Sequence, residues 1–248
     1  AFGCATKCLM RQSSTEFSQL LVKAGRGVGL PLGLAEDLID PVIWLQICGF
    51  PGEYEVHAAL AALDEGRTEA YFPDLLNTEE ATYSGRVSAV YLATAACDLL
   101  QLDWPQAGEE VLLPETESPR LVAAALVLSH RLLRRERYLR IVTSDEIFIS
   151  GPSAELTCVS KEPQHQTPSG IDKGVIRLSA EQSGFDGAGT VLIDGEKEAR
   201  FHDVCRLKGL CASPDIIAQL KIFSDRLLVP ESEHSLKYGA GAGIVDSD

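Results

Sequence analysis

Apolar residues recur at intervals of three and four positions through the first hundred residues of the chain. This spacing places side chains on one face of a helix. It predicts helices over residues 15–24, 33–45, 54–64 and 87–100. Ser14 or Thr15 is expected to cap the first helix, and Gly25 and Gly27 are expected to end it. Pro41 lies inside the second segment and predicts a kink or a division there.

Short runs typical of strands dominate the rest of the chain. They predict strands over residues 109–113, 138–143, 147–150, 155–160, 175–178 and 190–194. The apolar run at 121–133 is longer, and its length favours a buried helix. The Asp194-Gly195 pair, followed by alternating polarity over 199–204, predicts a β-hairpin. Pro214 is expected to open a final helix.

A helical first part joined to a β-rich second part predicts an α+β fold. We expect an N-terminal arm at residues 1–14 and a single α+β domain at 15–248. Within that domain a helical part, about 15–104, would pack against a β-rich part, about 105–248. A chain of 248 residues is long enough to bury a substantial core.

The charge balance excludes one class of partner. With 22 basic and 36 acidic residues, the chain carries a formal net charge of −14. Such a charge repels nucleic acid, whose binding depends on neutralising phosphates, so we expect no nucleic-acid partner. The longest apolar run, 121–129, is about half of the roughly 20 residues that a transmembrane helix needs. We therefore expect a soluble protein, and peripheral contact with a membrane complex is left open.

One cluster of basic residues stands out against this acidic background. Five arginines follow the apolar run: Arg131, Arg134, Arg135, Arg137 and Arg140. They are interpreted as a solvated face at the end of a helix, and the alternative is a docking patch for an acidic partner.

The cysteine content favours a reducing compartment. Seven cysteines are too few for a disulfide scaffold, and Cys48 and Cys97 lie in apolar helical patterns where a free thiol behaves as a small apolar group. Neither close pair, Cys4 with Cys8 or Cys205 with Cys211, has the spacing of a zinc site, so no metal and no cofactor is predicted.

The first residues resemble processing sites of plastid precursors, which leaves a cytoplasmic or an organellar location, such as a plastid, open.

Two glycine-rich segments, 25–33 and 239–243, are each expected to form a specific turn. The first lacks the preceding strand, the lysine and the hydroxyl residue of a phosphate-binding loop, which favours a corner between two helices. After this corner, Glu36 and Asp40 are one helical turn apart. They form either a cation-binding or acid–base pair, or an acidic first turn that complements the helix dipole.

The second glycine-rich segment is followed by Asp246 and Asp248. A tail this rich in glycine is costly to order, so it is either mobile or held in a groove. If it is held, its carboxylates would bind a cation or an arginine such as Arg26.

Both segments carry a resemblance to a known family. Residues 23–37, with Trp44 and the turn at 49–52, resemble the start of a bacterial family of uncharacterised proteins known only as a domain of unknown function. Its members share a Lys-Ala-Ala-Arg-Gly-x-Gly-x-x-x-Gly-Leu-Ala-Glu-Glu motif and close with Gly-Ala-Gly-Ala-Gly-x-x-Asp-x-Asp, as residues 239–248 do here. The similar length implies that the resemblance covers about residues 15–248. No activity is established for the family, so the resemblance assigns no catalytic residue.

The chain departs from the family pattern at two places. The family commonly has Ser-Trp-Gly where this chain has Pro31-Leu32-Gly33, and an arginine where it has Leu236. Loss of an aromatic platform and of a guanidinium would weaken an ancestral small-molecule site. Together with the lack of a complete catalytic motif, this predicts a non-catalytic accessory or interaction protein within a larger assembly.

The alternative is a small-molecule enzyme or a ligand-sensing module, so whether the protein is an enzyme stays undecided from the sequence. The site would lie between the 25–33 loop and the C-terminal tail. Its candidate residues are Arg26, Gly27, Gly29, Glu36, Asp246 and Asp248.

Overall fold

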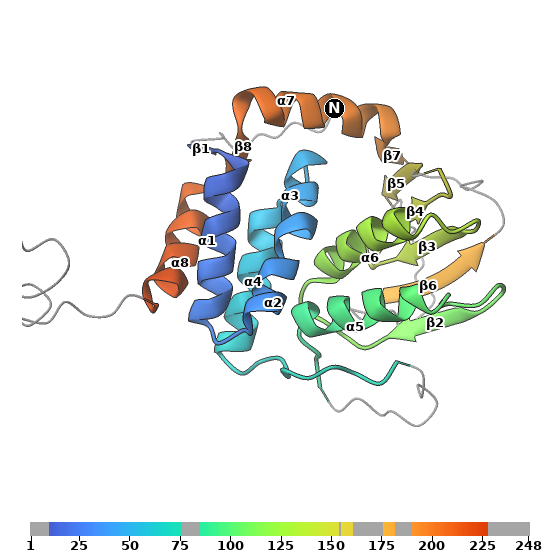
Figure 1. The fold of residues 1–248 in the computed structure, drawn as a ribbon, viewed down its shortest axis with the longest axis horizontal. Coiled ribbons are helices and arrows are strands. Elements are labelled where there is room, and N and C mark those ends of the chain that lie inside the picture. Colours follow the sequence, from blue (N-terminus) through green and yellow to red (C-terminus); the bar gives the residue numbers. More distant parts are fainter. Residues whose placement is uncertain (1–9, 76–84, 154, 161–175, 182–189, 228–248) are drawn as a thin grey trace, which may run out of the picture.

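A six-stranded sheet lies on one side of the molecule and a group of helices on the other (Figure 1). The structure is a computed structural model that describes residues 10–75, 85–153, 155–160, 176–181 and 190–227. The helices are α1 (Ser14–Gly27), α2 (Leu32–Asp37), α3 (Ile39–Ile47), α4 (Gly52–Asp64), α5 (Ala89–Gln101), α6 (Pro119–Leu133), α7 (Gly195–Lys208) and α8 (Pro214–Asp225). The strands are β1 (Met10–Gln12), β2 (Glu110–Leu113), β3 (Tyr138–Val142), β4 (Glu146–Ser150), β5 (Leu156–Ser160), β6 (Ile176–Glu181), β7 (Thr190–Asp194) and β8 (Leu210–Ala212).

The large sheet is antiparallel throughout, with the strand order β2-β6-β3-β4-β5-β7. Side chains of a strand alternate between the two faces of a sheet. The register therefore brings one row of buried residues to the same face: Val111, Leu178, Ile141, Phe148, Cys158 and Ile193. Helices α5 and α6 cover one face of this sheet (Figure 1). The predicted α+β class is confirmed.

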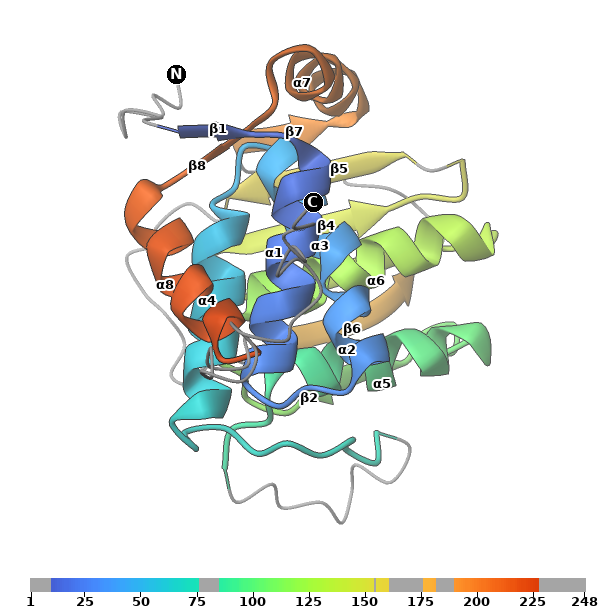
Figure 2. The same ribbon diagram turned by 60° about the vertical axis from the view of Figure 1, so that its left-hand side comes forward.

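Helix α6 lies at the centre of the fold. It packs against the sheet, beside α5, and against α3 and α4 on its other side (Figures 1 and 2). Nearly every side chain of its first half is buried: Leu121, Val122, Ala123, Ala124, Leu126 and Val127. This confirms the buried helix predicted at 121–133 and explains why its sequence is apolar on most sides. Across the described part of the chain, none of the helices has the length and apolarity needed to cross a membrane.

The strands predicted between residues 109 and 194 are all present, but the hairpin predicted after them is wrong. Residues 195–208 form α7 instead. Asp194 caps this helix by accepting a hydrogen bond from the backbone N–H of Lys197 at 2.9 Å, and Glu196 and Glu198 supply an acidic first turn. These helix-start signals outweigh the alternating polarity at 199–204.

The helix predicted over residues 33–45 is divided, but the break lies at Leu38, between α2 and α3, and not at Pro41 as predicted. Pro41 occupies the first turn of α3, where a missing N–H costs no intrahelical hydrogen bond. The first helix ends at Gly27, as predicted. Its cap is Ser13 and not Ser14 or Thr15, because Ser13 and Glu16 hydrogen-bond each other's backbone in a capping box.

Elements from the two ends of the described chain pack side by side. Helix α8 lies along α1, and β1 pairs antiparallel with β8 (Figure 2). At the end of α1 the two helices approach so closely that a Cβ atom built on Gly27 would lie 1.8 Å from the carbonyl oxygen of Phe223. At the end of α8, Arg226 forms a two-pronged ion pair with Asp64 of α4, at 2.5 and 2.9 Å.

We predict that Gly27→Ala lowers the free energy of unfolding by about 3 kcal/mol, because the added methyl group must push α8 away from α1. Gly33→Ala is the matched control, since a Cβ atom at Gly33 would meet nothing within 4 Å. Urea unfolding of both variants measures the difference. Equal stability of the two variants would contradict the close approach of α1 and α8.

Candidate functional site

The arginines after α6 are mostly engaged within the protein. Four of the five make hydrogen bonds or ion pairs with described residues: Arg131, Arg135, Arg137 and Arg140. Arg134 is exposed in a left-handed conformation (φ 49°), and within the described residues it makes no such contact. The segment is therefore neither a fully solvated face nor a free docking patch.

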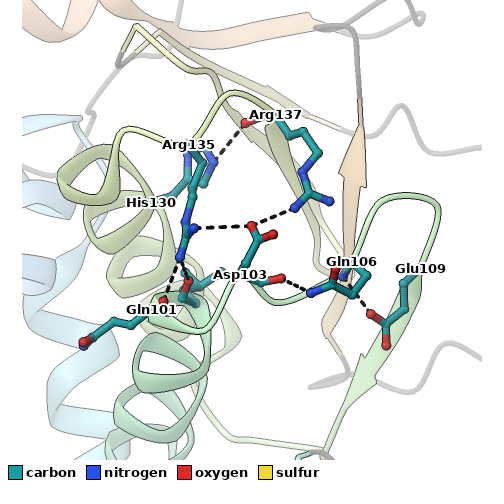
Figure 3. A network of polar contacts seen from close by, with 8 residues as sticks. Gln101, Asp103, Gln106, Glu109, His130, Arg135 and Arg137 are labelled. Carbon is teal, nitrogen blue, oxygen red and sulfur yellow. Dashed lines mark hydrogen bonds and ion pairs between the residues drawn. The ribbon is translucent and has the colours of Figure 1, made fainter.

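Two of these arginines organise the loop at 102–109 (Figure 3). Arg135 donates to the backbone carbonyls of Leu100 and Gln101 at 2.9 and 2.8 Å and so caps the end of α5. Arg135 and Arg137 also approach one carboxylate oxygen of Asp103, at 3.5 and 2.7 Å. Asp103 has a φ of 63°, a left-handed conformation that an aspartate tolerates better than most residues.

Hydrogen bonds within the loop complete this network (Figure 3). The side-chain amide of Gln106 donates to the carbonyl oxygen of Asp103 at 2.5 Å, and the carboxylate of Glu109 accepts from the backbone N–H of Gln106 at 2.8 Å. The loop is thus tied to α5, to the start of β3 and to itself, which holds it in one shape.

A cavity of about 240 Å³ lies against this loop. Its lining is Leu75, Leu99, Leu102, Trp104, Gln106, Glu109 and Val111. Leu75 and Trp104 are buried, whereas the side chain of Leu102 is 71% exposed. Pockets for whole small molecules start at about 300 Å³, so this cavity has room for about one side chain.

The cavity adjoins an edge of the sheet. Val111 of β2 faces the cavity, and the next residue, Leu112, is 56% exposed on the opposite face of the strand. Strand β2 is the last strand in the sheet order on this side. We call Leu102, the 102–109 loop, the cavity and β2 together the α5–β2 corner.

A second polar cluster is buried between α6, α4 and the sheet. Arg120 binds Glu55 of α4 at 2.6 Å and Glu146 of β4 at 2.5 Å, and its guanidinium lies 5.4 Å from the centre of the Phe50 ring. Burial raises the pKa of Glu55 against the opposing effect of Arg120. This cluster joins the helical layer to the sheet.

A third polar contact holds α7. Arg131 forms a two-pronged ion pair with Glu198 at 2.7 and 2.6 Å, and the indole N–H of Trp44 donates to the same carboxylate at 2.7 Å. Burial opposes ionisation, but the hydrogen bonds from Arg131 and Trp44 prevail and hold the pKa of Glu198 below its usual value.

Sequence reasoning missed the roles of these two arginines. Arg120 and Arg131 are 11 positions apart on α6, about three helical turns, so both lie on one face of an otherwise apolar helix. Two cations on one face of a buried helix require buried partners. The 11-residue spacing of these two arginines is the feature of the sequence that could have predicted their partners.

The predicted site residues lie mainly at the corner between α1 and α2. Arg26 and Glu36 are exposed, Gly27 contacts the backbone of α8, and Gly29 has a φ of 93° that allows the turn. Asp246 and Asp248 lie outside the described residues, so the predicted contact between the corner and the tail stays a prediction. Asp37, beside Glu36, has a raised pKa because of partial burial and the nearby charges of Asp98 and Glu36.

The nucleophilic and basic groups that are buried have ordinary structural roles. His130 contacts Ser150 through Nδ1 at 2.9 Å and the carbonyl oxygen of Arg137 through Nε2 at 3.1 Å. Because a carbonyl only accepts, Nε2 carries the proton, and burial lowers the pKa of the ring. Within the described residues, no group of three His, Cys, Asp or Glu side chains could hold a metal ion.

The described cysteines differ in their bonding. Cys48, Cys97, Cys158 and Cys205 are free, whereas Cys211 is disulfide-bonded, so the prediction of free thiols is confirmed only for the first four. Burial raises the pKa of Cys97 to about 12 and also raises those of Cys48 and Cys158. These three thiols stay protonated at neutral pH and are poor nucleophiles.

Comparison with known proteins supports one part of the sequence analysis. Residues 12–82 match the model of a family described as a protein of unknown function (DUF3726). The predicted resemblance to an uncharacterised family is therefore confirmed for this segment, which contains α1 to α4. No curated protein and no solved structure matches the chain. The loop and β2 of the α5–β2 corner lie outside the matched segment.

We predict that Glu198→Gln lowers the free energy of unfolding by about 2 kcal/mol at neutral pH, because it leaves the partly buried Arg131 without a charged partner. Asp203→Asn is the control: its ion pair with Arg206, on the same helix, is exposed and should contribute nothing measurable. Urea unfolding at several pH values measures both.

The pH dependence of this effect has a definite sign. Since the folded pKa of Glu198 is lowered, its contribution is complete above the ordinary value of 4.5 and is lost as the pH falls through the folded pKa. The stability difference between the wild type and Glu198→Gln should therefore shrink in acid. A difference that stays constant down to about pH 3 would contradict the ion pair.

Proposed function

We propose that the protein is a non-catalytic accessory protein that binds a protein partner through the α5–β2 corner. The observation that carries this proposal is the cavity beside an edge strand, lined by both apolar and polar side chains, with the exposed Leu102 on its rim. An exposed leucine gains roughly 25 cal/mol for each Å² that a partner removes from water.

The rigidity of the corner supports a binding role. Asp103, Arg135, Gln106 and Glu109 hold the loop through contacts within the protein. A surface that is already ordered loses little conformational entropy when a partner binds. The exposed Leu102 and the carboxylate of Glu109 remain at this ordered surface for contacts with a partner.

The proposed role also implies that the protein is a subunit of a larger assembly inside a cell. The four free cysteines support a reducing compartment, in the cytoplasm or an organelle, whereas the disulfide bond of Cys211 is uncommon in such compartments.

A small-molecule enzyme or sensor remains the second candidate because of Arg26. Its side chain is exposed, and within the described residues it makes no hydrogen bond or ion pair. It is therefore available for an anionic ligand at the corner between α1 and α2.

For the interaction role, we predict that tagged wild-type protein purified from its source cells retains a partner chain in a fixed ratio. Leu102→Asp should reduce that recovery at least about tenfold by placing a charge at the cavity rim. Leu207→Asp is the control, since Leu207 is 74% exposed on α7, away from the corner. Equal recovery with the two variants, or no partner with the wild type, would exclude the corner as the interface.

For the second candidate, we predict that anionic metabolites raise the melting temperature of the wild type and not that of Arg26→Ala. The unliganded variant should melt with the wild type, because the side chain that is removed is exposed. Lys23→Ala, one turn earlier on α1, is the control cation. If every anion acts equally on all three proteins, Arg26 holds no ligand.

A further inference from the structure

We propose that the α5–β2 corner binds its partner by strand addition. An extended, lysine- or arginine-bearing segment of the partner pairs with the edge of β2 that no other described strand occupies, and it inserts one apolar side chain into the 240 Å³ cavity. This inference rests on the proposed interaction role and names the chemistry of the partner.

The edge of β2 offers backbone groups for pairing. On one side β2 pairs antiparallel with β6 over residues 110–113, and no other described strand pairs with β2. Every second residue of an edge strand directs its N–H and C=O away from the sheet. These groups accept an added strand independently of its sequence.

The alternation of side chains along an added strand matches the two faces of the corner. Residues opposite one another on neighbouring strands point to the same face of a sheet. A partner residue opposite Val111 would therefore point toward the cavity, and its neighbour would lie beside the exposed Leu112. The added strand thus needs an apolar residue at the cavity position, and a second apolar residue is favoured next to it.

Charge selects the kind of segment that can bind. Glu109 is exposed and lines the cavity, and Glu110 begins β2 with its side chain 56% exposed beside Arg177. A second copy of this chain would bring the same glutamates to the interface and would add a second net charge of −14. A basic segment, in contrast, gains favourable contacts with Glu109 and a long-range attraction.

The nearby arginines do not reverse this preference. Arg135 and Arg137 are held by Asp103, and Arg177 is held by Glu110 at 2.8 Å. The exposed carboxylate of Glu109 accepts only a backbone hydrogen bond among its described contacts and keeps its charge for a partner.

The test uses an array of capped peptides of about six residues, with lysine at both ends and Val, Leu, Phe or Thr varied at the alternating central positions. The full-length chain is the binding protein, and fluorescence anisotropy measures the best peptides. We expect micromolar dissociation constants (about 1–100 μM) for peptides with a large apolar residue at one central position. Methylation of alternate backbone nitrogens in one of the two registers should weaken binding at least about tenfold, because it removes the ladder hydrogen bonds.

Protein variants locate the binding site. Leu102→Asp should weaken the best peptide at least about tenfold, while Leu207→Asp should leave it unchanged. Glu109→Gln keeps the acceptor for Gln106 and removes the charge, so it should weaken lysine-ended peptides several-fold and leave their uncharged analogues unaffected.

Three results would overturn strand addition: no peptide binds, methylated peptides in both registers bind as tightly as their parents, or Leu102→Asp has no effect on binding. If these occur while partner recovery from cells still depends on Leu102, the interaction role stands and only the strand mechanism is wrong. If recovery from cells does not depend on Leu102 either, the interaction role of the corner is lost as well.

Discussion

The relative position of the sheet and the helices depends on two arginines on one face of α6. Arg120 binds Glu55 and Glu146, and Arg131 binds Glu198. Apolar packing between layers has no preferred direction, whereas paired hydrogen bonds between a guanidinium and carboxylates hold one geometry. Loss of one partner in such a pair costs about 2 kcal/mol or more, because the remaining charge is partly buried. The apolar packing of α6 thus stabilises the fold, and its two arginines fix the position of the helices relative to the sheet.

This alignment also determines where the two ends of the described chain meet. Because Arg131 holds α7 through Glu198, the chain crosses from β7 at the sheet to β8 beside the helices (Figure 1). Strand β8 then pairs with β1, and α8 packs along α1 at a distance that only glycine at position 27 allows. Helix packing therefore explains the glycine at position 27, at the end of α1. The exposed Arg26 beside it is the group that is available to bind a ligand.

The α5–β2 corner combines rigidity with exposed apolar surface. Its charged side chains are mostly paired within the protein, and its loop is fixed at both ends. A surface that is already ordered loses little conformational entropy when a partner binds. This combination supports binding of a protein partner at the corner, and the edge of β2 there supports binding by strand addition.

The sequence by itself determined the helices and strands, because burying one face of an element imposes a period that is visible in the order of residues. The buried helix at 121–133, the break near Pro41 and the strands from 109 to 194 were predicted for this reason. It did not predict α7, because the alternating polarity at 199–204 is typical of a strand, although Asp194 caps a helix in the structure. It also missed the α5–β2 corner and the ion pairs between residues far apart in the sequence. Glu198 is 67 residues from Arg131, and Asp103 is 34 residues from Arg137. A charge in a sequence does not show which distant charge it will meet, since only the stacking of the layers brings the two together.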